Sequence, residues 1–239
     1  MTHAAVGDGL EAARKGLLTA PALPSRLRAW LGPLAVLAAL VVVVLGVLYA
    51  GDSEPGAVDA RIAAAVYGPG PPWPHVVTAM DFLGDPAGAV ILVGAVLTGC
   101  LLLRSPRAAV LVVAGTGLPV VTTTLLKRVV GRTINGGHLS FPSGHTAFLT
   151  AFALVLALLV TGRLGLGRTA GTVLVLTAAL VAGAAMGWAQ VALGAHYPTD
   201  ALGGWCTALA VVPATAWLAD RTADRRVEPL VDAGRRDSR

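Results

Sequence analysis

Long runs of apolar residues dominate this sequence and limit the ways in which it can fold. No charged side chain interrupts residues 30–50, and five later runs come close to or exceed the roughly 18 apolar residues that cross a bilayer as a helix. The predicted spans are residues 30–50, 87–103, 108–126, 144–161, 169–188 and 200–218. Only helices and closed barrels satisfy backbone groups in lipid, and strict alternation is absent. The sequence therefore predicts an all-α polytopic membrane protein with six transmembrane helices.

The composition supports this prediction. Hydrophobic residues make up 55% of the chain and charged residues only 13%, about half the charged share of a soluble domain. The net charge of +5 comes from basic residues in short connections and tails, where orientation signals lie, so no nucleic-acid partner is expected. Cys100 and Cys206 both fall inside apolar runs, which indicates packing and not a disulfide framework.

The distribution of basic residues predicts the orientation. If both termini are cytoplasmic, fourteen Lys and Arg residues lie inside and four outside, which favours an N-in, C-in topology. We expect a cytoplasmic N-terminal tail (1–28), a six-helix membrane domain (29–219) and a cytoplasmic C-terminal tail (220–239). The Ala-, Val- and Arg-rich composition is typical of bacteria, so the cytoplasmic membrane of a bacterium is the expected location.

Polar residues gather on the predicted outer side in three clusters. The first contains Lys127, Arg128 and Arg132, in "LLKRVVGRT". Basic residues at a helix end commonly reach toward lipid headgroups. Because this side is otherwise poor in basic residues, these three need an anionic partner, either headgroups or a bound phosphate.

The second cluster is "PSGH", which ends at His145 and directly precedes the fourth span. Ser143 suits the N-cap position, and Gly144 allows a ligand close to the backbone. The free N–H groups of the first helical turn then form an anion site. His145 is placed to give or take a proton. The alternative is simply a capped helix with an interfacial histidine.

The third cluster is "HYPTD", with His196 and Asp200 at its ends. Pro198 suits the first turn of a helix, so Asp200 is expected to reach back toward the His196 ring. A carboxylate on one ring nitrogen fixes the tautomer and frees the other nitrogen as a nucleophile or base. The alternative is a capping aspartate beside an interfacial histidine. Together, the three clusters provide cations, a helix N-terminus and two histidines, a combination that indicates phosphoryl chemistry.

With these motifs, residues 30–218 resemble the type 2 phosphatidate phosphatases, the membrane lipid phosphate phosphatases related to vanadium haloperoxidases. The family pattern is a lysine followed by a GRxRP-like stretch, then PSGH, then SRxxxxxHxxxD. The resemblance implies that His196 is the nucleophile that forms a phosphohistidine, that Asp200 orients it and that His145 is the general acid. It also implies that Lys127, Ser143 and the Gly144 N–H hold the phosphoryl oxygens, without a metal or cofactor.

Three positions depart from this pattern. Ile134 and Gln190 stand where the family has phosphate-binding arginines, and Ala189 replaces the serine. Gln supplies no charge, so weaker phosphate binding is expected unless Arg132, the best substitute, compensates. Arg128 and His138 are further accessory candidates, although His138 more simply caps its loop.

The expected function is hydrolysis of a lipid phosphate or diphosphate that enters from the bilayer, at the extracytoplasmic face. Polyprenyl diphosphate, phosphatidylglycerophosphate and phosphatidate all fit, and an outward-facing site in a bacterium favours the first. Ile134 and Gln190 motivate an alternative, a lipid-phosphate-binding protein with reduced or lost catalysis, and a phosphotransferase would use the same site. A metalloprotease is disfavoured because no HExxH is present. The oligomeric state is not indicated.

Overall fold

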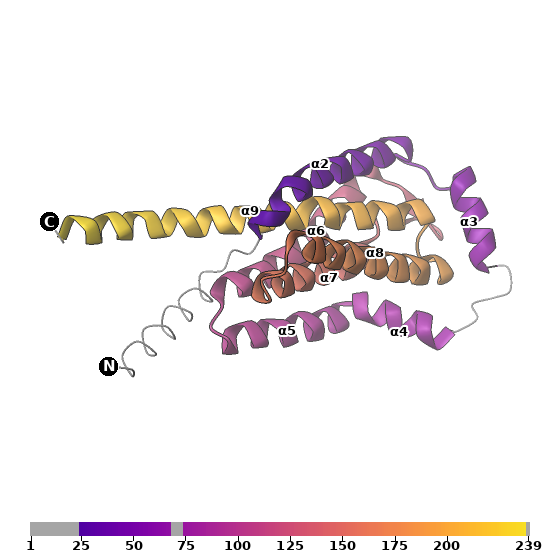
Figure 1. Cartoon of the computed structure of the whole chain (residues 1–239). Helices are drawn as coiled ribbons and strands as arrows, with labels where there is room; N and C mark the ends of the chain where they lie inside the picture. The colour runs from indigo at the N-terminus through magenta and orange to yellow at the C-terminus, as the bar shows by residue number, and fades with distance from the viewer. Residues whose placement is uncertain (1–23, 68–73, 238–239) are drawn as a thin grey trace.

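The computed structural model describes residues 24–67 and 74–237, and the part described is almost entirely helical (Figure 1). Residues 1–23 and 238–239 of the two predicted tails lie outside it. The helices are α2 (Ser25–Leu48), α3 (Ala57–Tyr67), α4 (Pro74–Gly84), α5 (Pro86–Leu102), α6 (Pro106–Val130), α7 (Gly144–Arg163), α8 (Arg168–Ala192) and α9 (Pro198–Asp237). Two short strands, β1 (Thr133–Ile134) and β2 (His138–Leu139), form a hairpin.

The prediction of a six-span helical membrane protein is confirmed. In the described residues, five helices are long and apolar enough to cross a membrane. The pair α4 and α5 makes a sixth candidate, which is bent by 65°. The bend lies where Asp85 adopts an extended conformation and Pro86 opens α5, because proline lacks the N–H group that would continue the preceding helix. The sequence predicted only the α5 half of this span.

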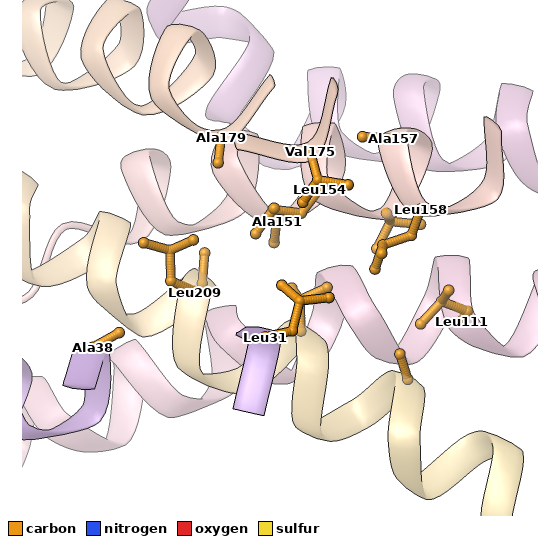
Figure 2. Packing of buried hydrophobic residues seen from close by; sticks show 14 of the residues in the cluster. Leu31, Ala38, Leu111, Ala151, Leu154, Ala157, Leu158, Val175, Ala179 and Leu209 are labelled. Atoms are coloured by element: carbon orange, nitrogen blue, oxygen red, sulfur yellow. The ribbon is translucent and has the colours of Figure 1, made fainter. Parts of the chain in front are cut away.

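Helix α7 lies in the middle of the bundle, packed against α6, α8 and α9. Figure 2 shows its inward side chains, among them Leu154 and Leu158, meeting Leu111 of α6 and Leu209 of α9. Helix α2 packs along α9, but most of its Val and Leu side chains face outward. An apolar outer surface over a packed interior is what a bilayer requires, since lipid tails solvate such side chains.

The connections at one end of the bundle hold the polar motifs together. The N–H of Gly51 donates to Val130 O, and the N–H of Thr133 donates to Asp52 O, so the chain after α2 is fastened to the chain after α6. The β1–β2 turn places Asn135 in the left-handed region, and its side chain donates to Gly194 O at 2.7 Å. These bonds bring segments far apart in sequence to one rim.

The opposite end is joined by an ion pair. Arg28 of α2 lies 3.0 Å from Asp220 of α9, so the first and last spans are tied there. Helix α9 continues to Asp237, through the segment predicted to be a C-terminal tail, and projects beyond the bundle (Figure 1). The tail boundaries and the N-in, C-in orientation remain predictions.

Candidate active site

His196 and Asp200 lie at the junction of α8 and α9, and the backbone there fixes their relation. The N–H groups of Ala195 and His196 both donate to Gln190 O, which turns the chain back over the end of α8. Helix α9 begins at Pro198, as predicted, so Asp200 lies in its first turn. Its Oδ2 accepts from the Tyr197 N–H at 3.0 Å and lies 3.7 Å from His196 Nδ1. At that distance the carboxylate faces the ring without forming a hydrogen bond to it.

Burial favours the neutral form of the His196 ring. Its side chain is buried, and this burial lowers the pKa of His196. The Asp200 carboxylate opposes the shift, while Lys127 and His145 add to it. Because Lys127 and His145 both act on the pKa of His196, both residues lie within electrostatic reach of its ring. A neutral imidazole with a carboxylate beside Nδ1 has Nε2 available as a nucleophile.

Helix α7 provides the predicted anion site. Ser143 caps it, because its Oγ accepts from the Thr146 N–H at 3.4 Å. The Ser143 N–H donates to Asp200 O at 2.9 Å, so the second motif is bonded directly to the third. Gly144 opens the helix beside Thr123 of α6. The first-turn N–H groups of α7 thus begin next to the His196 loop, as an anion at a helix N-terminus requires.

His145 meets two carboxylates that sequence reasoning missed. Its Nε2 lies 3.2 Å from Asp85 Oδ1 and 3.5 Å from Asp81 Oδ1, both contributed by the α4–α5 bend. The buried Gln190 donates from Nε2 to the same Asp81 oxygen at 2.7 Å. Gln190 therefore borders the site, but its amide is engaged with an acid. An Asp-Pro pair at a helix start was the available signal for Asp85.

The other predicted phosphate ligands divide into two groups. Lys127, in the last turn of α6, is half-buried and close enough to act on His196. Arg128 and His138 are exposed, and His138 pairs through its backbone with Ile134 in the hairpin. Of these three residues, only Lys127 lies close to His196.

Arg132 is placed differently from the phosphate-binding role predicted for it. It is fully buried, with Nη1 2.7 Å from Asp200 Oδ1 and Nη2 2.7 Å from Asp59 Oδ2. Its guanidinium lies 4.1 Å from the centre of the Tyr49 ring and 4.3 Å from that of Tyr197. Both ends of its fork are occupied by carboxylates, because the helix that carries Asp59 folds back over the loop. Arg132 therefore supports Asp200 from behind.

The comparisons with known proteins agree with this arrangement. Residues 108–223 match the family model of the PAP2 superfamily, and this stretch contains all three motifs. The solved structure of a transmembrane PAP2-type phosphatidylglycerolphosphate phosphatase from Bacillus subtilis is similar in fold, with a TM-score of 0.61 and 22% identity. The match covers 81% of this chain and 96% of that one. No curated protein matches the chain.

The PAP2 region is bordered by an apolar groove between α3, α8 and α9. Its volume is about 400 Å³, which is within the usual range of ligand pockets. Its lining includes Gly183, Gly187, Trp188, Pro198 and Trp205. The groove and the PAP2 motifs share the α8–α9 junction, because Pro198 stands two residues after His196. Among the described residues, no group of three His, Cys, Asp or Glu side chains is arranged to hold a metal ion.

Proposed function

We propose that this protein is a membrane phosphatase that hydrolyses a lipid phosphate or diphosphate through a phosphohistidine. One observation carries the proposal. A buried histidine, His196, has a carboxylate beside one ring nitrogen, Lys127 and His145 lie within electrostatic reach of it, and the start of α7 is bonded to the same junction. The match of residues 108–223 to the PAP2 superfamily supports a phosphatase, and the apolar helices support a substrate drawn from the bilayer.

In the proposed reaction, His196 Nε2 attacks phosphorus while the ring keeps its proton on Nδ1, facing Asp200. The bond from phosphorus to the lipid oxygen breaks, and that oxygen leaves with a proton from His145. Water then attacks the phosphohistidine, gives a proton back to His145, and releases phosphate and free His196. Each histidine ends as it began, so the cycle needs no metal or other cofactor.

The proposed phosphoryl site uses fewer cations than the family pattern. Lys127, the Ser143 hydroxyl and the Gly144 N–H hold the non-bridging oxygens, whose charge grows as phosphorus is attacked. Ile134 lies in the hairpin, and Gln190 is directed to Asp81. Neither replaces the charge of an arginine, so we expect modest affinity for the phosphoryl group alone.

Binding energy from the lipid chain offsets this weakness in the proposed substrate complex. The groove beside Pro198 has walls of Trp, Leu, Val and Ala, and its chemistry suits an acyl or isoprenoid chain. With the active site facing the outside of a bacterial cytoplasmic membrane, we favour a polyprenyl diphosphate over phosphatidylglycerophosphate and phosphatidate.

Phosphate release from a panel of these three lipids in detergent tests the proposal, together with a short-chain alkyl phosphate. We expect wild-type protein to release phosphate from at least one long-chain lipid and less from the short-chain compound. His196→Ala should abolish release, and rapid acid-free quenching should trap a phosphorylated intermediate in the wild type only. Undiminished activity of His196→Ala would exclude the mechanism.

The acidic surroundings of His145 favour a second candidate function. Asp81 and Asp85 lie close to the presumed path of an anionic substrate, and like charges repel. A lipid-phosphate-binding protein with reduced turnover is consistent with these carboxylates. A phosphotransferase that passes the phosphoryl group to an alcohol would use the same phosphohistidine. Phosphorylated product in the presence of added alcohols identifies the latter, and lipid retention without phosphate release identifies the former.

A further inference from the structure

We propose that Asp59, acting through Arg132, is a positioning residue for the Asp200–His196 pair, and that helix α3 is therefore part of the active site. Asp59 lies outside residues 108–223, which match the PAP2 superfamily, and outside all three motifs. The kinetic measurements on Asp59 variants rest on the proposed function, whereas the titration of His196 does not.

A continuous chain of short hydrogen bonds joins Asp59 to Asp200. The carboxylate of Asp59 accepts from the Thr199 N–H at 2.8 Å, from the Thr199 hydroxyl at 2.9 Å and from Arg132 Nη2 at 2.7 Å. Arg132 Nη1 donates to the Thr199 hydroxyl and to Asp200 Oδ1, each at 2.7 Å. Because Oδ1 of Asp200 is held in this way, Oδ2 is the oxygen left to face His196.

Burial makes this geometry rigid. Asp59, Arg132 and Asp200 are each 0% exposed, and the guanidinium is enclosed between the Tyr49 and Tyr197 rings. A buried charge that loses its partner is strongly destabilised, so each ion pair holds its two residues in place. Helix α3 is thereby fastened to the α8–α9 junction, where His196 lies.

The cluster also has an electrostatic consequence. Two carboxylates and one guanidinium leave one negative charge in excess next to His196 Nδ1. When Nε2 bonds to phosphorus, the ring becomes cationic, and a fixed negative charge nearby stabilises it. Without Asp59 the remaining Arg132–Asp200 pair is neutral, and this stabilisation is lost.

Other charged groups also act on His196, but Asp59 is separable from them. Lys127 of α6, His145 of α7 and Asp200 of α9 act on the ring, and Asp81 of α4 and Asp85 of the α4–α5 bend contact His145. Lys127 and His145 are also proposed to contact the substrate. Asp59 is bonded only to Arg132 and Thr199 among these side chains, so replacing it changes the charge without removing a group that contacts the substrate.

The Asp59→Asn variant tests the inference, with Glu54→Gln as a control that removes the same charge from an exposed site on the same connection. We expect kcat to fall about 10- to 100-fold, as when other residues that orient a functional histidine are lost, with KM nearly unchanged. Burial already lowers the pKa of His196, and removing a negative charge lowers it further. The acid limb of the kcat/KM profile should therefore move to lower pH. Kinetics equal to those of Glu54→Gln would overturn the inference.

A titration that needs no activity separates this inference from the proposed function. The His196 ring is followed by NMR in detergent, with His196→Ala identifying its signal. The midpoint should be lower in Asp59→Asn than in wild type, even if no lipid is hydrolysed, and an unchanged midpoint would overturn the inference. Should Asp59→Asn not fold, Asp59→Glu carries the test. It keeps the charge but displaces it, so kcat should fall while the midpoint stays, and a wild-type kcat would refute positioning.

Discussion

At the scale of single residues, the contact between Gln190 and Asp81 shows what stands where the resemblance leads one to expect a phosphate-binding arginine. The Gln190 amide donates to Asp81 at 2.7 Å, and the same Asp81 oxygen lies 3.5 Å from His145. Gln190 thus links the end of α8 to the carboxylates beside the presumed general acid. An arginine at this position would meet Asp81 before it met a phosphate, so its effect depends on that carboxylate.

We expect Gln190→Arg to tighten the binding of inorganic phosphate, measured as product inhibition, by about fivefold, because a charge-assisted hydrogen bond is roughly 1 kcal/mol stronger than a neutral one. In the double variant Gln190→Arg/Asp81→Asn the gain should be larger, since no carboxylate then neutralises the new guanidinium. Asp81→Asn alone serves as the control. Equal inhibition constants in all four proteins would show that this position does not border the phosphoryl site.

Single residues also show which parts of the site a local sequence pattern can predict and which it cannot. Ser143, His145, His196 and Asp200 stand in short contiguous motifs whose chemistry can be read from neighbouring positions. Asp59, one of the two carboxylate partners of Arg132, is 73 residues away in the sequence, and no local pattern indicates such a pairing. Sequence reasoning accordingly gave Arg132 a phosphate to neutralise, whereas the folded chain supplies two carboxylates.

At the scale of elements, the bend between α4 and α5 positions His145. Gly84 ends α4 directly against the His145 side chain, and a Cβ atom there would overlap the imidazole ring. The bend therefore brings the Asp81 and Asp85 carboxylates to His145 Nε2. It also brings the Gly84 backbone against the Cβ, Cγ and Cδ2 atoms of His145.

Gly84→Ala should displace the His145 ring and lower kcat about 100-fold, the usual cost of a misplacement of roughly 1 Å in a catalytic group. Alanine has the higher helix propensity, so the melting temperature should change far less than activity. Gly94→Ala in α5 is the matched control, because a Cβ atom there meets nothing within 4 Å. Equal loss of activity in both variants would contradict a specific contact with His145.

The elements also divide into those that hydrophobic runs predict and those that they do not. Helices α2, α6, α7 and α8 coincide closely with the predicted spans, because a bilayer requires long uncharged helices. Helices α3 and α4 were missed. They lie in a Gly- and Pro-rich connection and are largely exposed, and each is anchored by a buried residue, Asp59 in α3 and Val77 in α4, whose long-range contacts the local sequence does not reveal.

At the scale of the whole molecule, orientation is the main property still predicted from charge alone. His145, His196, Asp59 and the β1–β2 hairpin lie at the same rim of the bundle. All of them therefore face the same side of the membrane, and locating one of them locates the others. The excess of Lys and Arg in the other connections and tails predicts that this rim faces the outside.

Thiol labelling tests the orientation without removing any native cysteine, because Cys100 and Cys206 are the only two in the chain and both are buried. In intact cells a membrane-impermeant maleimide should modify Glu54→Cys, which lies on the rim of the active site. It should modify Leu164→Cys, at the opposite end of the bundle, only after permeabilisation. The reverse pattern would place the site in the cytoplasm.

The Asp59–Arg132–Asp200 cluster takes its members from three connections spread over most of the chain. Asp59 and Arg132 are synthesised before Asp200 and can pair with each other, but the carboxylate that faces His196 arrives only with the last span. Under the proposed mechanism, competence for hydrolysis therefore arises only when that span has been inserted. A chain that ends before the α8–α9 junction lacks both His196 and Asp200.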